Sequence, residues 1–280
     1  MNTEESLIGR VTDSLWKMPF GIDYVDENYL RRKYGNKVIN RYYRLAEKCI
    51  LEDHTKEDHQ ELMDYVYKTG LSDDIDPPTT LRSRETFKIL FNYLARENEY
   101  FTLLDLGSGD GKIGIGLAAR LENLERLYAV DISPFAIERM RKNIGLLGEE
   151  DQERVRRKLV DIRADYRPVG FQASMLAMEP KGIPIIMAAH VNDNDDVYPV
   201  FREMSGKGGK LVICDQRAIP EQVEETDIAE INRGTCIYDN QFRTQGQEHG
   251  VDIKMAAHME VFPIRIMLLL FVGRKAEGPE

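Results

Sequence analysis

The sequence of 280 residues has only three cysteines, Cys49, Cys214 and Cys236. They lie too far apart for the paired spacing of a structural zinc site or of a dithiol redox motif. The five histidines offer no metal-ligand spacing either, so no bound metal is expected. Without a disulfide framework, the chain is expected in a reducing, intracellular compartment, which we take to be the cytoplasm.

Long hydrophobic runs are also missing. The longest apolar stretch, Ile266 to Val272, is far shorter than the ~20 residues that a membrane-spanning helix needs. The first residues, MNTEESLIGR, carry acids and no apolar run, unlike a signal peptide. We therefore expect no membrane partner and interpret the apolar stretch as a buried strand.

Basic residues are outnumbered. The 38 lysines and arginines face 48 aspartates and glutamates, which gives a formal net charge of -10. Such a field repels polyanions, so nucleic acid is disfavoured as a partner. With 42% hydrophobic and 31% charged residues, the composition is that of an ordinary globular protein.

Two regions of different pattern follow one another along the chain. Residues up to about 100 lack strand alternation and favour helices, and we interpret residues 1–78 as a helical cap. Beyond it, apolar runs alternate with helix-like segments, the pattern of an α/β fold whose parallel sheet is covered on both faces. The expected strands are Thr102 to Leu106, Leu127 to Val130, Arg157 to Val160, Ile185 to Ala189, Lys210 to Cys214, and an antiparallel pair, Val251 to Phe262 and Ile264 to Val272.

The strongest chemical signal is the segment LLDLGSGDGKIG, residues 103–114. An apolar strand leads into Gly107, Gly109 and Gly111 and then into a helix. Glycines let the backbone approach a ligand closely and adopt positive φ, while free amides at the helix start attract an anionic group. Asp105, two residues before the first glycine, suits a ligand with an ammonium group, such as the amino acid moiety of methionine.

Acids also mark the next two expected strands. Asp131 ends the strand after the glycine loop, a position suited to a carboxylate that binds both hydroxyls of a ribose. Asp161 is expected to end the third strand, where it can accept from the exocyclic amine of adenine while the amide of Ile162 meets a ring nitrogen. Asp165, four residues further on, competes for this role.

The stretch over about residues 101–161 resembles class I S-adenosylmethionine-dependent methyltransferases. The resemblance implies S-adenosylmethionine as cofactor, with Asp131 as the family's ribose acid and Asp161 as its adenine acid. It also implies a Rossmann-like, doubly wound, mostly parallel seven-stranded sheet over residues 79–280. The cofactor-binding residues that it implies are Asp105, Gly107, Ser108, Gly109, Gly111, Asp131, Ile132, Asp161 and Ile162.

One rival motif shares part of the glycine loop. The segment GDGKIG, residues 109–114, also fits the spacing of a dinucleotide-binding loop. In that frame the two residues before it are extra, and Asp105 and Asp110 would crowd a pyrophosphate with negative charge. A cationic sulfonium ligand fits these acids better, so a nicotinamide-linked oxidoreductase is the weaker alternative.

His190 is the candidate general base. It directly follows the fourth expected strand, and strand ends of this sheet type face the ligand crevice. An acceptor hydroxyl, carboxyl, thiol or protonated amine needs such a base. A histidine that only packs beside the cofactor explains the same position, so both interpretations stay open.

The cap and the helix that follows it offer candidate acceptor-binding residues. Arg82 and Arg84, at a helix start before the first strand, can meet an acceptor's carboxylate, and Tyr24 is a further candidate. Packing against the sheet explains most of the cap's aromatic residues equally well. The tyrosines of the cap are Tyr24, Tyr29, Tyr34, Tyr42, Tyr43, Tyr65 and Tyr67.

The acceptor is the least determined part of the prediction. A cap of this size favours methyl transfer to a small molecule that it encloses, followed by transfer to a protein lysine. Aminocarboxypropyl transfer and a non-catalytic S-adenosylmethionine-binding module are the remaining alternatives, because glycine motifs do not separate them from a methyltransferase.

Overall fold

The computed structural model describes residues 27–49, 55–72, 81–189, 196–218, 228–261 and 266–276. The described chain begins with the expected helical cap, whose helices share an apolar core that includes Ile39, Leu62 and Leu71. A capping box between Thr55 and Asp58 satisfies free amides at the start of the third helix. The helices are α2 (Glu27–Tyr34), α3 (Asn36–Lys48) and α4 (Lys56–Thr69).

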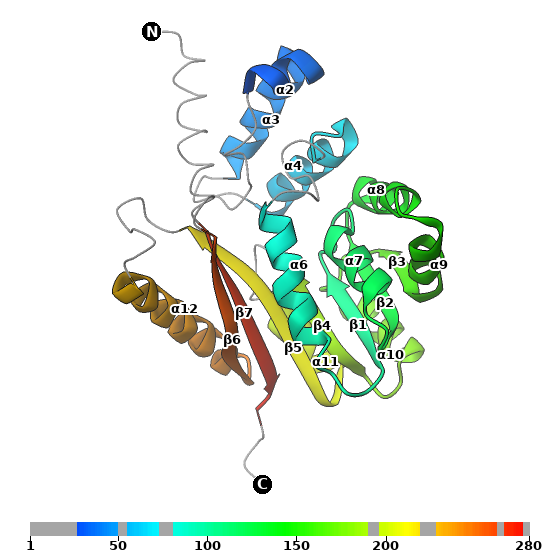
Figure 1. Cartoon of the computed structure of the whole chain (residues 1–280), viewed down its shortest axis with the longest axis vertical. Coiled ribbons are helices and arrows are strands. Elements are labelled where there is room, and N and C mark those ends of the chain that lie inside the picture. The colour runs from blue at the N-terminus through cyan, green and yellow to red at the C-terminus, as the bar shows by residue number, and fades with distance from the viewer. Residues whose placement is uncertain are drawn as a thin grey trace.

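One seven-stranded sheet forms the centre of the remaining chain (Figure 1). Its strand order is β3-β2-β1-β4-β5-β7-β6, and β7 runs antiparallel to both of its neighbours. This confirms the expected Rossmann-like, doubly wound, mostly parallel sheet with an antiparallel pair at the C-terminal end. The strands are β1 (Phe101–Leu106), β2 (Leu124–Asp131), β3 (Leu159–Arg163), β4 (Ile183–Ala189), β5 (Ser205–Ala218), β6 (Val251–Val261) and β7 (Ile266–Lys275).

Helices cover both faces of the sheet (Figure 1). Because successive strand side chains alternate between the faces, Leu103 belongs to the core on one side and Leu104 to the core on the other. The first face carries α6 (Leu81–Leu94), α7 (Lys112–Arg120), α8 (Pro134–Gly145) and α9 (Glu149–Lys158). The second face carries α10 (Val169–Met178), α11 (Val197–Met204) and α12 (Ile228–Glu248).

The expected strand at residues 157–160 begins and ends too early. The structure begins β3 at Leu159 and continues α9 to Lys158. The Lys158 ammonium group, in the last residue of α9, donates to the carbonyl oxygen of Leu121 at the C-terminal end of α7, at 2.6 Å. Asp161 therefore lies in the middle of β3 and does not end it.

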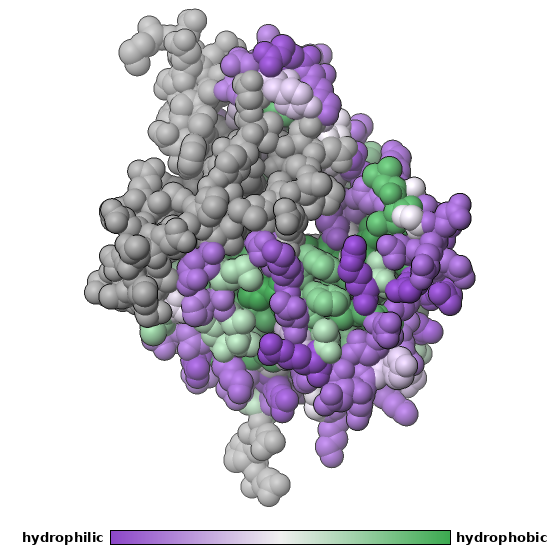
Figure 2. All heavy atoms as spheres, in the orientation of Figure 1, coloured by the Kyte–Doolittle hydropathy of each residue, from purple (hydrophilic) through white to green (hydrophobic). Residues whose placement is uncertain are grey.

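The expected boundary between residues 78 and 79 falls within 73–80, outside the described residues. None of the described helices is long and apolar enough to cross a membrane. On the face seen in Figure 2, hydrophilic residues cover most of the described surface, and hydrophobic residues occupy smaller areas between them.

Candidate active site

The glycine loop connects β1 to α7 at the carboxyl edge of the sheet. Gly107, Gly109 and Gly111 have φ values of 67°, 55° and 76°, a left-handed region that disfavours side chains. At Gly111 a Cβ would also lie 2.6 Å from Cγ of Met140 in α8. A hydrogen bond of 2.9 Å from the Ser108 amide ties the loop to the end of β2. Backbone shape and the close approach of α8 together account for the glycines.

Asp105, next to last in β1, is only 3% exposed. Its Oδ2 atom faces Gly114 of α7, where a Cβ would lie only 3.0 Å away and crowd the carboxyl group. Burial, and to a lesser degree the charge of Asp131, raise the pKa of Asp105 to about 8. The ligand-free protein therefore keeps a proton on this group at neutral pH, and a bound ammonium group is the kind of cation that can replace it.

Asp131, at the end of β2, accepts hydrogen bonds from two backbone amides. Its Oδ2 atom accepts from Gly109 and its Oδ1 atom from Ser133, each at 2.8 Å. Burial raises the pKa of Asp131, the two amides lower it, and the charges of Asp64 and Asp110 raise it again. The carboxylate thus joins the glycine loop to the start of α8. Asp131 therefore lies beside the loop, where its position at the strand end predicts it.

The two acids near the end of β3 both have cationic partners. Asp161 accepts from Arg141 Nε at 2.5 Å. Asp165 follows the strand end and binds Arg167 through two side-chain hydrogen bonds of 2.7 and 2.6 Å. Of the two competing acids, Asp165 lies nearer to the carboxyl edge of the sheet along the chain, because β3 ends at Arg163.

Three further residues of the expected cofactor set differ in their surroundings. The Ser108 hydroxyl oxygen is buried and has no hydrogen-bond partner among the described residues. Ile132 is 37% exposed just beyond Asp131, whereas Ile162 packs against the core on the α10 side of the sheet. The hydroxyl group of Ser108 and the exposed side chain of Ile132 follow neighbouring strands at the carboxyl edge of the sheet. Together they suit a ligand with polar and aromatic parts.

Two residues of α4 that sequence reasoning did not select also reach this edge. A Cβ on Gly109 would lie 2.6 Å from the Tyr67 hydroxyl oxygen, so Tyr67 rests directly on the glycine loop. Asp64 is close enough to Asp131 to raise its pKa, and the Asp64 Oδ1 atom is buried with no hydrogen-bond partner among the described residues.

Contacts with α8 hold α4 in this place. The Lys68 ammonium group lies 5.5 Å from the ring centroid of Phe135, and a Cβ on Gly70 would lie 3.5 Å from Arg139 Nη1. The tyrosine-rich composition of the cap was a signal for Tyr67. Nothing in the local sequence distinguished Asp64 from the other acids of its helix.

Several expected site residues fall outside what the structure describes. His190 directly follows β4 and lies outside the described residues, as does Tyr24. Arg82 and Arg84 lie in the first turn of α6, and their side chains are not among those described.

Carboxylates dominate the charge at this edge. Lys112 lies 3.3 Å from Asp110, and both side chains are largely buried, so this pair offsets its own charge. Asp64 and Asp131 remain around the glycine loop, and Asp105 adds a third negative charge once a bound cation displaces its proton. Their combined field favours a cationic ligand over a pyrophosphate.

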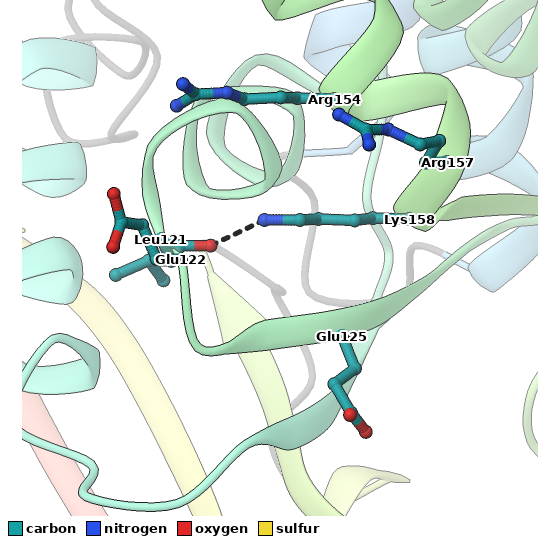
Figure 3. Close-up of a pocket in the computed structure, with 6 residues that line it drawn as sticks. All are labelled: Leu121, Glu122, Glu125, Arg154, Arg157 and Lys158. Atoms are coloured by element: carbon teal, nitrogen blue, oxygen red, sulfur yellow. Dashed lines mark hydrogen bonds between the residues drawn. The ribbon is translucent and has the colours of Figure 1, made fainter.

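A shallow basin of about 310 Å³ lies away from this site (Figure 3). It sits beside the start of β2 and the end of α9, at the edge of the sheet opposite to the glycine loop. Arg154, Arg157 and Lys158 line it together with Glu122 and Glu125. Its mixed charges and its distance from the loop separate it from the candidate active site.

Comparisons with known proteins give a family and several structures of similar fold. A family model described as a methyltransferase domain matches residues 97–251. No curated protein matches the sequence.

Among solved structures, PH0793 from Pyrococcus horikoshii has a TM-score of 0.43 at 14% identity, with 68% of this chain and 64% of that chain covered. Precorrin-6y C5,15-methyltransferase from Geobacter metallireducens has a TM-score of 0.42 at 12% identity, over 71% of this chain and 89% of that one. Ribosomal protein L11 methylase from Lactobacillus delbrueckii has a TM-score of 0.41 at 14% identity, over 71% and 80%. The chain thus spans just under two thirds of the length of PH0793, and these structures leave its acceptor open.

Proposed function

Because the chain belongs to the methyltransferase domain family, we propose that it methylates a small molecule held between the helical cap and the carboxyl edge of the sheet. Its cofactor is S-adenosylmethionine, and its reaction is methyl transfer. In this proposal the chain divides into a cap over residues 1–78 and a catalytic domain over residues 79–280. The cap and the domain together bind the acceptor, and the domain binds the cofactor.

The cofactor-binding part of the proposal starts from Asp105. A buried carboxyl group whose pKa is about 8 gains most from a cation placed beside it, which suits the ammonium group of the cofactor. Asp131 binds the ribose hydroxyls, and the exposed Ile132 packs against adenine. The residues proposed for the methionine moiety are Gly107, Ser108, Gly109 and Gly111.

Asp161 and Ile162 complete the proposed set at adenine. The hydrogen bond from Arg141 leaves Asp161 fewer lone pairs for adenine, because its Oδ2 atom already accepts from a charged donor. Asp165 is held by Arg167 in the same way. Either acid can accept from the adenine amine through its remaining lone pairs, and the Asp161 assignment stays a proposal.

The position of α4 is the single observation that supports a small acceptor. Tyr67 lies on the glycine loop and Asp64 lies beside Asp131, so the cap forms a wall directly over the proposed cofactor site. A wall this close leaves room for a small molecule more readily than for a folded protein surface. The surrounding carboxylates favour an acceptor with a cationic group, such as an amine.

The cofactor supplies a methyl group that is already activated on a sulfonium. The chain's residues then need to align the acceptor with that group and to exclude water. Tyr67 covers the loop at Gly109. His190 accepts a proton from the acceptor atom, and Arg82, Arg84 and Tyr24 orient the acceptor.

A panel of small amines, carboxylates and phenols, assayed for S-adenosylhomocysteine formation, tests this function. Turnover of a small acceptor, lost in Asp105→Ala and kept in the exposed control Asp252→Ala, is the expected result. Turnover only with lysine-containing proteins would replace the proposal by protein methylation, to which the same carboxylates are suited. Methylthioadenosine as the product would instead reveal aminocarboxypropyl transfer, and cofactor binding without any product would indicate a non-catalytic module.

A further inference from the structure

The strand β3 forms one open edge of the sheet (Figure 1). The amide of Ala164, just past β3, donates to the carbonyl oxygen of Asp131 in β2 at 3.0 Å. Because the direction of the backbone groups alternates along a strand, the amide and carbonyl groups of residues 160 and 162 also point toward β2. The amide and carbonyl groups of Leu159, Asp161 and Arg163 consequently point away from β2, and no other described strand pairs with them. These are the groups that a further strand would bind.

The opposite edge of the sheet carries a similar sequence but is covered. The strand β3 reads Val-Asp-Ile-Arg from residue 160, and β6 reads Val-Asp-Ile-Lys from residue 251. At β6, however, the helix α12 lies alongside, and its Asp239 accepts the Met255 amide at 3.0 Å (Figure 1). Among the described residues, a helix thus binds an outward amide at the β6 edge, whereas the outward backbone groups of β3 pair with no further strand.

Apolar residues are exposed on β3 and on the helix that follows it. The helix α10 follows β3 and contains no charged residue. Val169 is 78% exposed, Met178 is 47% exposed, and Val160 of β3 itself is 39% exposed. A helix whose outer face is meant for water normally carries charged residues there, so this face is suited to contact with another apolar surface.

We propose that two copies of this chain associate through β3, paired antiparallel with Ile162 opposite Ile162 on a two-fold axis. In this register Asp161 of each copy lies opposite Arg163 of the other, on the same face of the joined sheet. Val160 lies opposite Ala164 on the other face, next to the uncharged α10. Opposite charges and apolar pairs directly across two strands both stabilise the pairing.

Neighbouring registers are less favourable. A shift of the axis to Asp161 places two aspartates directly opposite one another, which is destabilising. A shift of the axis to Val160 places Leu159 opposite Asp161 and leaves both charges without a partner across the strands. The charge pattern of this short strand therefore selects one register of a symmetric, closed pair.

The association leaves the candidate active sites apart. Because the paired strands run in opposite directions, the carboxyl edges of the two sheets lie at opposite ends of the joined sheet. Each copy keeps its own glycine loop and cap. Asp161 and Ile162 belong both to this pairing and to the set proposed at adenine, whereas Arg163 is in no proposed ligand set, so variants of Arg163 separate the two proposals. The inference goes beyond the proposed function. Its readout is mass in solution and not activity.

Charge reversal at the two paired positions tests the register. Sedimentation equilibrium over a range of concentrations should show a dimer for the unaltered chain and for Lys254→Asp, the matched control on β6. Arg163→Asp should be monomeric, because aspartate then opposes aspartate twice, and Asp161→Arg should be monomeric because arginine opposes arginine twice. An equimolar mixture of these two variants should dimerise, because each position then meets its opposite charge.

Two results would overturn the proposal. One is an unaltered chain that stays monomeric over the whole range, even if another protein binds this edge. The other is dimerisation of Arg163→Asp that is as strong as that of the unaltered chain. If circular dichroism shows that Asp161→Arg does not fold, Arg163→Pro replaces it in the test. Proline removes an outward-pointing amide without affecting the hydrogen bonds to β2. That variant should be folded and monomeric, and a folded dimer would contradict the inference.

Discussion

The amide of Gly109 donates a hydrogen bond of 2.8 Å to Oδ2 of Asp131, across 22 residues of sequence. The same carboxylate accepts from Ser133 with its other oxygen, so it links the glycine loop to the first turn of α8. A single side chain therefore holds together the end of β2, the loop and a helix start, and it does so where a ribose is expected.

Replacing Asp131 with alanine should weaken binding of S-adenosylhomocysteine by roughly 1 to 3 kcal/mol, the cost of losing hydrogen bonds to a charged acceptor. The fold should survive, because the loop keeps its other hydrogen bonds. Titration calorimetry measures the affinity, and circular dichroism checks the fold. Unchanged affinity in a folded variant would place the ribose elsewhere.

Cofactor binding should release a proton from Asp105. The carboxyl group is protonated in the ligand-free protein below its pKa of about 8, and an ammonium group requires the ionised form. Affinity for S-adenosylhomocysteine should therefore rise with pH up to about 8, by up to about tenfold per pH unit. Calorimetry in buffers of different ionisation enthalpy counts the released protons, and Asp105→Asn should bind weakly and release none. Proton release equal to that of the unaltered chain would assign the proton to another group.

The same group should make the ligand-free protein less stable as pH rises. The pKa of Asp105 is about 8 in the folded protein and near 3.8 in the unfolded chain, so between these values the folded state binds the proton more tightly. Stability is therefore lost as pH increases from about 4 to about 8. Asp105→Asn should remove this loss. Urea unfolding at several pH values should show that the free energy of unfolding of the variant rises relative to that of the unaltered chain as the pH approaches 8. Parallel pH profiles for the two proteins would contradict the assignment.

Alanine at Gly109 should be destabilising for two separable reasons. The φ of 55° costs a side chain about 1 to 2 kcal/mol, and the new Cβ would lie 2.6 Å from the Tyr67 hydroxyl oxygen. In a Tyr67→Phe background the nearest remaining atom is Tyr67 Cζ at 3.6 Å, so the second cost should vanish. Thermal unfolding of the single and double variants measures this coupling.

Gly145→Ala is a control without either cost, because Gly145 is not among the positive-φ glycines and nothing lies within 4 Å of a Cβ there. It should leave the melting temperature nearly unchanged in both backgrounds. If the cost of Gly109→Ala is the same with tyrosine and with phenylalanine at position 67, α4 does not rest on the loop in solution.

His190→Ala should lower turnover by ~100-fold while leaving cofactor affinity nearly unchanged, if His190 is the general base. With an unperturbed pKa of about 6.5, a histidine base makes activity rise with pH through that region, and the rise should vanish in the variant. Single-turnover rates across pH at saturating cofactor make the comparison. Equal rates and equal pH profiles for the unaltered chain and the variant would show that His190 is not the general base.

Local pattern was sufficient for the fold class and for the shape of the glycine loop with Asp131 beside it. The glycine loop, its preceding acid and Asp131 lie within 27 residues of one another, and one strand, one turn and the next strand bring them together. A β-strand that leads into a glycine turn and a helix has few alternative shapes, because the glycine φ values and the free amides depend on neighbouring residues. The antiparallel pair at the C-terminal end was predicted for the same reason, since its two strands are adjacent in the sequence.

The tertiary structure decided what depends on contacts between distant segments. The helix before β3 continues to Lys158, whose ammonium group binds the end of α7, 37 residues away, and Asp161 lies in mid-strand beside Arg141. The placement of Tyr67 on Gly109 and of Asp64 beside Asp131 depends on how α4 packs against α8. Such packing energy arises from surfaces that many residues form together, and no local pattern in the sequence reports it.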